Sequence, residues 1–164
     1  MTTEFKESAL RVAEWLKGRP VEPGLAAELN ARFPVDGREF RELAEACKAG
    51  VLDGKLAIHQ SGPVKFERVI EPSDDSHRFS VDVVVAPVFS GRRHSHPTGE
   101  IDMIIPLHPD ARFDDHGEGW LVYPPESEHT PTTTGGDAII IYFLPEGQID
   151  WEDERVANLA SEVG

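Results

Sequence analysis

The feature that most constrains the fold is a series of short β-rich runs between residues 55 and 144, separated by Pro, Gly and Asp. The gaps between these runs are too short for crossover helices, so neighbouring strands must pair antiparallel. A sheet of about six to eight such strands hides its edges best as a small barrel or jelly roll, which encloses one pocket. The predicted strands cover residues 56–59, 64–70, 79–89, 101–107, 120–123 and 138–144.

The first 50 residues carry the spacing typical of helices. Apolar residues recur three to four positions apart in 5–16, in 25–33 and in 40–47. Asp36 and Glu39 form an acidic variant of the capping box ahead of the third run. The apolar stripes are narrow and the helices short, so we expect them to pack on the barrel or on a partner subunit.

A chain of 164 residues suits a single domain with one core. We divide it into a helical extension over 1–52, a barrel over 55–146 and an acidic tail over 147–164. The tail is rich in Asp and Glu, which predicts a short solvated helix outside the core.

Charge and cysteine content exclude several classes of function. Lys and Arg number 16 against 30 Asp and Glu, and the resulting net charge of −14 argues against nucleic-acid and membrane-surface partners. The single cysteine, Cys47, lies on an apolar helix stripe and is expected to be a small buried hydrophobe. No apolar signal core opens the chain, and no apolar run approaches the roughly 20 residues of a membrane span. We therefore expect a cytoplasmic protein.

A cluster of potential metal ligands stands in the middle of the chain. His94 and His96 are two residues apart, so in a strand both imidazoles point to the same face. The turn at 97–99 would bring Glu100 back toward them, and His129 offers a third imidazole. Three His and one carboxylate suit Fe, Mn, Ni, Cu or Zn as a divalent ion, with positions left for water or substrate. The histidines without partners at such spacing are His59, His77, His108 and His116.

The stretch from His94 to His129 resembles the cupin superfamily. The first cupin motif contains His-x-His-x-x-x-Glu, and the second contains a Gly, then a Pro and then a His five residues after that Pro. The resemblance implies a jelly-roll barrel in which His94, His96, Glu100 and His129 bind one divalent metal ion. Glu126 stands where the second motif usually has its Gly.

Nearly the whole chain is similar to a narrower family, the 4-hydroxylaminobenzoate lyases, which pair a helical N-terminal segment with a cupin barrel. The similarity is carried by residues 94–102, 119–125 and 135–146. It implies a reaction that takes an aromatic hydroxylamine and water to 3,4-dihydroxybenzoate and ammonia. That reaction has no net redox change and uses no organic cofactor.

Such a reaction needs a proton donor or acceptor and a cation for the aryl carboxylate. Glu126, Glu128 and Tyr123 lie within six residues of His129 and are candidate acids or bases, with Glu126 and Tyr123 preferred. Arg92 and Arg93 are candidate carboxylate clamps, since a guanidinium can hold a carboxylate through two hydrogen bonds. Apolar walls for the substrate ring are available at Phe79, Val81, Ile104, Phe113 and Tyr142.

The sequence thus predicts a mainly β protein, a cupin-like jelly-roll β-barrel with an N-terminal α-helical extension. We interpret it as a metal-dependent lyase or hydrolase acting on 4-hydroxylaminobenzoate or a related aryl hydroxylamine. Its expected partner is a small anionic aromatic substrate, with no nucleic acid and no membrane, and a homodimer is left open. The alternatives are an Fe(II)-dependent cupin dioxygenase on a small aromatic substrate and a non-catalytic small-molecule-binding cupin.

Overall fold

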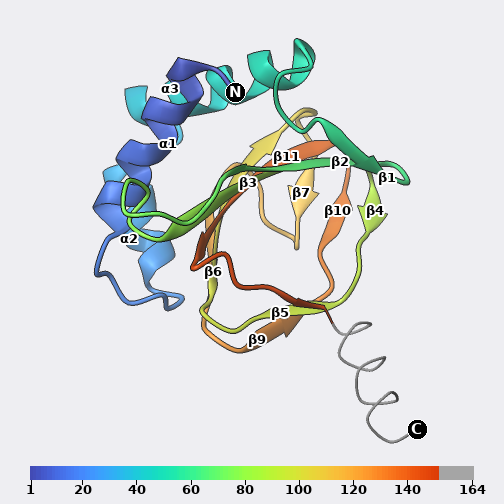
Figure 1. Ribbon diagram of the computed structural model, residues 1–164. Coiled ribbons are helices and arrows are strands. Elements are labelled where there is room, and N and C mark those ends of the chain that lie inside the picture. The colour runs from blue at the N-terminus through green and yellow to red at the C-terminus, as the bar shows by residue number, and fades with distance from the viewer. Residues whose placement is uncertain (152–164) are drawn as a thin grey trace, which may run out of the picture.

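The structure, a computed structural model, describes residues 1–151 (Figure 1). Three N-terminal helices lie outside a ring of antiparallel strands. The predicted fold class, a cupin-like barrel with a helical extension, is confirmed. Within the described residues, no helix has the length and apolar character needed to cross a membrane.

The helices are α1 (Thr3–Leu16), α2 (Leu25–Arg32) and α3 (Arg38–Leu52). Thr2 caps α1, where its side-chain oxygen accepts a hydrogen bond from the Phe5 N–H at 3.3 Å. The predicted capping box of α3 is wrong, because Gly37 is the N-cap residue and makes no side-chain cap bond. Glu39 instead pairs with the guanidinium of Arg32 at 2.7 Å.

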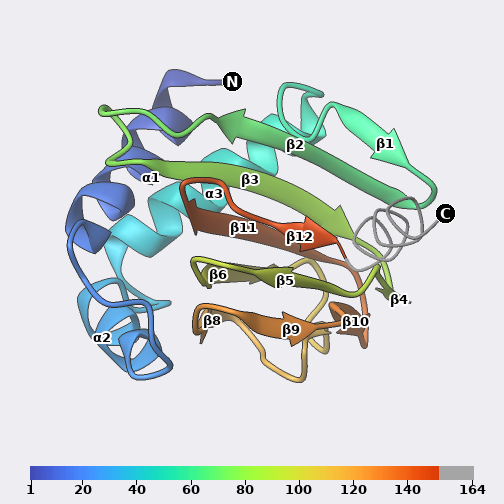
Figure 2. The same ribbon diagram turned by 60° about the horizontal axis from the view of Figure 1, so that its bottom comes forward.

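The strands within residues 1–151 form one large and two small sheets. The large sheet has the order β1-β2-β3-β11-β6-β8, and the small sheets have the orders β4-β10-β7 and β12-β5-β9. Figure 2 shows the barrel after a turn about the horizontal axis, with the helices beside the large sheet. The strands are β1 (His59–Ser61), β2 (Val64–Ile70), β3 (Phe79–Ala86), β4 (Phe89–Ser90), β5 (His94–His96), β6 (Glu100–Pro106), β7 (Arg112–Phe113), β8 (Gly119–Tyr123), β9 (Ser127–His129), β10 (Thr132–Thr134), β11 (Ala138–Pro145) and β12 (Asp150–Trp151).

Successive side chains of the large sheet point alternately to an outer face, which packs against the helices, and to an inner face, which points into the barrel. The side chains on its outer face and those of the helices form one continuous apolar core. The helices thus pack on the barrel, which is one of the two arrangements expected from the sequence. The indole N–H of Trp120 on β8 donates to the Phe33 carbonyl after α2 at 3.0 Å, which ties the helical layer to the sheet. Cys47 belongs to this core, and burial raises the pKa of its thiol to about 12, as expected for a small buried hydrophobe.

The inner face carries a smaller apolar cluster together with polar side chains. One row runs across four neighbouring strands in register, from Arg68 through Asp82 and Tyr142 to Asp102. Arg68 donates to Asp82 from Nε at 2.9 Å and from Nη2 at 3.2 Å. The side chains that point into the barrel therefore include a polar wall, and we call the interior of the barrel the lumen.

Two boundaries differ from those predicted. The first strand begins at His59 because Leu56 and Ala57 are buried in the core beside α3. The barrel continues past residue 146, since β12 pairs with β5 through Asp150↔Ser95 and Trp151↔His94. The predicted solvated helix is thus wrong for residues 150–151, and its remainder, residues 152–164, lies outside the described part of the chain.

Candidate metal centre

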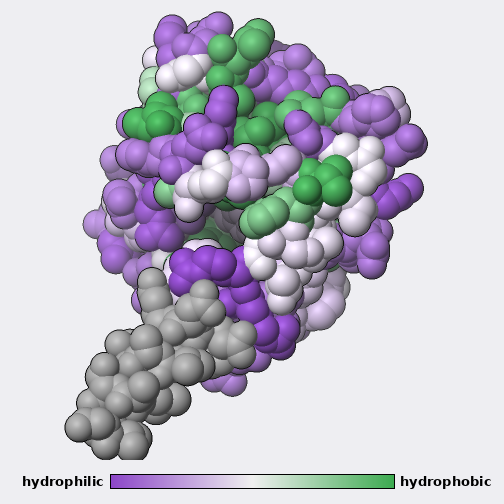
Figure 3. Space-filling model, turned by 90° about the vertical axis from the view of Figure 1, so that its right-hand side faces the viewer, coloured by the Kyte–Doolittle hydropathy of each residue, from purple (hydrophilic) through white to green (hydrophobic). Residues whose placement is uncertain are grey.

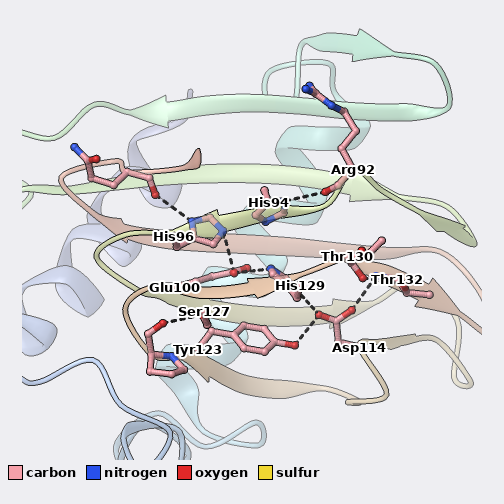
Figure 4. Close-up of polar contacts among 12 residues, drawn as sticks. Arg92, His94, His96, Glu100, Asp114, Tyr123, Ser127, His129, Thr130 and Thr132 are labelled. Atoms are coloured by element: carbon pink, nitrogen blue, oxygen red, sulfur yellow. Dashed lines mark hydrogen bonds and ion pairs between the residues drawn. The ribbon is translucent and has the colours of Figure 1, made fainter. Parts of the chain in front are cut away.

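Three strands bring together the predicted ligands. His94 and His96 are the ends of β5, Glu100 begins β6, and His129 ends β9 directly opposite His94. The turn between β5 and β6 needs Gly99, whose φ is +93° and where a Cβ would lie 2.5 Å from Val21 Cγ1. Figure 4 shows the four side chains converging in the barrel. One ligand atom from each lies within 4.8 Å of the others.

The backbone orients two of the imidazoles. His94 Nδ1 lies 2.9 Å from the Arg92 carbonyl oxygen, and His96 Nδ1 lies 3.1 Å from the Gln148 carbonyl oxygen. A carbonyl oxygen can only accept, so each Nδ1 carries the hydrogen and donates it. Each Nε2 is therefore left with its lone pair directed into the cluster, as metal ligation requires.

A carboxylate orients the third imidazole. His129 Nδ1 donates to Asp114 Oδ2 at 2.8 Å, and His129 Nε2 lies 2.8 Å from Glu100 Oε2. His96 Nε2 lies 3.0 Å from the same Glu100 oxygen. Glu100 thus stands between two imidazole nitrogens.

The donor atoms of this cluster fit a divalent metal ion. The three Nε2 atoms and both Glu100 oxygens are buried, and none makes a hydrogen bond of suitable geometry within the described residues. Around an ion about 2.1 Å from each ligand, two ligands at right angles stand about 3.0 Å apart. The spacings of 2.8 and 3.0 Å from Glu100 Oε2 to His129 Nε2 and His96 Nε2 match that value, so these three atoms could share one ion.

The pKa values of the clustered side chains shift in different directions. Burial and the neighbouring His96 lower the pKa of His94 to about 4. Burial also opposes the charged form of His129, but the hydrogen bond to Asp114 and the nearby Glu100 carboxylate outweigh it and raise its pKa to about 9. Burial similarly opposes ionisation of Glu100, yet His129 and His96 hold its pKa well below the usual range. Glu100 is thus a carboxylate at neutral pH, with His94 neutral and His129 protonated until metal binds.

A second buried carboxyl group lies beside this cluster. Asp102 is two residues after Glu100 on the same face of β6, is 0% exposed, and has no hydrogen-bond partner for either oxygen among the described residues. Burial and the Glu100 charge raise its pKa well above the usual value. The polar wall thus approaches the metal cluster along β6.

The structure treats the predicted acid–base residues differently. Tyr123 lies at the site, where its ring is 4.4 Å from that of His129 and its hydroxyl donates to Asp114 at 2.7 Å. Burial and Asp114 raise the pKa of Tyr123. The Glu126 side chain is exposed and is not brought into the cluster. Its backbone φ of +68° explains why the cupin motif has Gly there, and its N–H donates to the His96 carbonyl at 2.9 Å.

The predicted carboxylate clamps are both exposed. Arg93 contacts Glu128 with Nη2 to Oε2 at 3.3 Å. The Arg92 guanidinium lies 4.6 Å from the centre of the Trp151 ring, which is 4.9 Å from the His94 ring. In Figure 4 the Arg92 side chain points away from the four ligands while its carbonyl faces His94. Arg92 is thus connected to the metal cluster through one intervening ring.

The predicted apolar walls divide between the two faces of the large sheet. Ile104 and Phe113 belong to the inner cluster, and Tyr142 packs against it. Phe79 and Val81 are not available as walls, because both pack in the outer core with the helices. The reason is strand alternation, since odd-numbered side chains of β3 face outward.

The sequence interpretation missed Asp102, Asp114, and the contributions of Gln148 and Trp151. Asp102 was detectable, because it shares a face of β6 with Glu100. Asp114 reaches His129 only through the pairing of β10 with β7, which no local motif reveals. Gln148 acts through its carbonyl, a group that every residue carries.

The barrel and its buried His and Glu side chains define a cupin-type protein with a candidate metal centre. The family model PnbB, 4-hydroxylaminobenzoate lyase, matches residues 7–151. A 4-hydroxylaminobenzoate lyase from Nocardioides sp. (strain LMS-CY) is 33% identical over 147 residues, which cover 84% of this chain and 86% of the relative. The chain therefore belongs to the 4-hydroxylaminobenzoate lyase family and is a lyase.

Further comparisons give more distant similarities. A 4-hydroxylaminobenzoate lyase from Pseudomonas putida is 29% identical over 154 residues, covering 84% of this chain and 88% of the relative. An RmlC-like cupin protein from Ralstonia eutropha is similar in structure over 54% of this chain and 57% of its own, with 21% identity and a TM-score of 0.39. A cupin-like protein from Thermotoga maritima has 15% identity and a TM-score of 0.32 over 54% of this chain and 74% of its own.

Proposed function

We propose that this protein converts 4-hydroxylaminobenzoate and water to 3,4-dihydroxybenzoate and ammonia in a metal-dependent reaction. The substrate is taken from the names of the relatives. The observation that carries the metal dependence is the buried cluster of His94, His96, Glu100 and His129, whose donor atoms have no hydrogen-bond partner within residues 1–151. A metal ion bound there would supply a Lewis acid and an activated water.

The proposed reaction balances without an external oxidant. The N–O and C–N bonds of the hydroxylamine break, and two aryl C–O bonds are present in the product. Nitrogen gains two electrons on becoming ammonia, and the aromatic ring loses two on becoming a catechol. The chain therefore has to bind and orient the substrate and to move protons.

We assign the proton donor to Tyr123. Its hydroxyl donates to Asp114 at 2.7 Å and its ring lies beside His129, so Tyr123 is a phenol next to the candidate metal ligands. To give its proton to the departing nitrogen, the hydroxyl would have to turn from Asp114 to the substrate. Glu126, on the exposed rim, is the proposed group that exchanges protons with solvent.

We assign the substrate carboxylate to Arg92 or Arg93. The protein's net charge of −14 disfavours an anion, so the carboxylate needs a local cation. Arg92 is the better placed, because the Trp151 ring stands between its guanidinium and His94. An aromatic ring lying along Trp151 would then have its carboxylate at Arg92 and its reactive nitrogen toward the metal.

An apolar rim supports an aromatic ligand. Figure 3 shows a hollow in the face opposite the helices, bordered in part by apolar side chains. Two exposed phenylalanines, Phe66 on β2 (38%) and Phe89 on β4 (41%), stand on strands at that side of the barrel. Small-molecule sites are commonly lined by aromatic side chains, so these two rings are candidates for contact with the substrate.

The test is an anaerobic assay of the metal-loaded protein with 4-hydroxylaminobenzoate, in which ammonia and 3,4-dihydroxybenzoate should appear in equal amounts. Product that requires oxygen would point to the dioxygenase alternative. Tight binding with no product would point to the non-catalytic one. Either result overturns the proposal.

The clamp assignment is tested with Arg92→Ala and Arg93→Ala, each assayed with 4-hydroxylaminobenzoate and with an analogue lacking the carboxylate. Loss of a bidentate clamp should weaken transition-state binding of the carboxylate substrate by about 2 to 4 kcal/mol. This loss would be measured as a lower kcat/KM for that substrate. Metal content and turnover of the analogue should not change. If both variants discriminate the two substrates as the parent does, the clamp lies elsewhere.

A further inference from the structure

We propose that Asp114 is a positioning residue that fixes His129 as a ligand of the metal centre and holds Tyr123 against the same imidazole. The proposal rests on the metal-dependent function proposed above. It assigns a role to a side chain that no ligand motif contains.

The Asp114 carboxylate accepts three hydrogen bonds from three different segments. Oδ2 accepts from His129 Nδ1 at 2.8 Å and from the Tyr123 hydroxyl at 2.7 Å. Oδ1 accepts from the Thr132 N–H at 2.8 Å. Figure 4 shows Asp114 at the meeting point of these groups, on the far side of His129 from Glu100. One side chain therefore sets the orientation of the ligand and of the proposed proton donor.

His129 differs in this respect from the other two imidazoles. The Nδ1 atoms of His94 and His96 donate to main-chain carbonyls, so the path of the chain alone orients those rings. The Nδ1 of His129 donates to a side chain, whose rotamer must itself be fixed. A carboxylate partner also increases the basicity of the imidazole toward a metal ion. Asp114 thus supplies what the backbone supplies elsewhere in the site.

The backbone around Asp114 is shaped to present its carboxylate. Phe113 and His116 form a tight hairpin, with Phe113 N–H to His116 O at 2.8 Å and the reverse bond at 2.9 Å. The two residues between them, Asp114 and Asp115, have φ of +47° and +67°. Such a turn favours Asn-Gly or Asp-Gly, so two aspartates in succession are a costly choice. The strained conformation is held in place because Asp114 N–H also donates to Thr132 O at 2.8 Å.

The test measures binding of Co²⁺ alone to the metal-free protein, following the visible absorption that reports the ligand geometry. Asp114→Ala should weaken Co²⁺ binding by about 10- to 100-fold and alter the spectrum, because His129 loses its orienting partner. Asp114→Asn should recover part of this loss, since its amide oxygen still accepts from Nδ1. Asp115→Ala is the matched control, because it also replaces an Asp with an Ala at a position of positive φ, one residue further along the turn.

The outcomes separate the two proposals. Failure of the parent protein to bind Co²⁺ would contradict the proposed metal centre itself. With the parent binding, an unchanged affinity and spectrum in Asp114→Ala overturns the positioning role, as does an equal loss in Asp115→Ala. Should Asp114→Ala not fold, Asp114→Asn decides. Its neutral acceptor makes a weaker hydrogen bond, so unchanged binding by that variant also overturns the proposal.

Discussion

The two faces of the large sheet do different work although the same strands make both. On β11, Ile139, Ile141 and Phe143 point outward and are buried against the helices, with at most 1% exposure. Tyr142, between them, points inward and lies in register between Asp82 and Asp102. Strand alternation therefore places an apolar surface and a polar surface within one residue of each other.

The difference separates stability from chemistry. The outer face stabilises the fold by removing apolar surface from water, at about 25 cal/mol per Å² buried. The inner face buries Glu100 and Asp102, whose desolvation opposes their charged forms. A barrel that lacked the helical layer would have to stabilise this polar lumen with much less buried apolar surface. The apolar surface buried between the N-terminal helices and the sheet thus offsets the free-energy cost of burying these carboxyl groups.

The largest expected effect comes from removing a candidate metal ligand, His96 on β5, which lies across the barrel from the inner face of the large sheet. His96→Ala deletes an imidazole whose Nε2 faces Glu100 at 3.0 Å, and it should abolish stoichiometric metal binding. Metal analysis of the purified variant is the measurement. His59→Ala is the control, because His59 is exposed on β1. Full occupancy in His96→Ala would contradict the ligand assignment.

The next largest effect lies on the outer face. Phe143 is fully buried and its ring is 6.1 Å from that of Trp120, so Phe143→Ala should lower the free energy of unfolding by about 3 to 5 kcal/mol. Denaturant titration measures this loss. Tyr142→Phe is the control one residue away, and removing its hydroxyl should cost about 1 kcal/mol or less. Equal losses of unfolding free energy in the two variants would contradict the conclusion that the outer face contributes most of the stability.

The elements and ligands with a local signature could be predicted from the sequence. The strand predicted over 64–70 matches β2, because alternation and flanking turn residues define it without help from the rest of the fold. The side chains of the four candidate ligands lie together, and for His94 and His96 the reason is local, since their same-face spacing is a property of the strand itself.

What could not be predicted depends on contacts between distant segments. The two-residue strands β4, β7 and β12 exist through their partners and carry no hydrophobic period of their own. The outward direction of Val81 depends on which face of β3 the helices cover. The role of Asp114 depends on a hairpin whose positive φ values are unusual for aspartate pairs. In each case the deciding partner is far away in the sequence.

Proton competition at His129 gives an intermediate effect on metal binding. In the metal-free protein its pKa is about 9, so at neutral pH a metal ion must displace one proton from this ring. His94, with a pKa of about 4, is already neutral. The apparent metal affinity should therefore rise about tenfold per pH unit from pH 7 and level off above the pKa of His129. Calorimetry in buffers of different ionisation enthalpy would detect the released proton, and a pH-independent affinity would contradict it.

The last expected effect concerns Asp102, the buried carboxyl group without a hydrogen-bond partner among the described residues. Its pKa is raised in the folded, metal-free protein, mainly by burial and then by the charge of Glu100, so the folded state keeps this proton to a higher pH than the unfolded chain does. Stability from this group is therefore greatest below its unfolded pKa near 4 and falls by up to about 1.4 kcal/mol per pH unit as the pH rises toward the folded pKa. Asp102→Asn cannot titrate, so its advantage in unfolding free energy over the parent should grow between pH 4 and pH 6. Denaturant titrations of both metal-free proteins at several pH values measure that difference. A constant difference would show that Asp102 is partnered in solution and that the inner face costs the fold less than its burial implies.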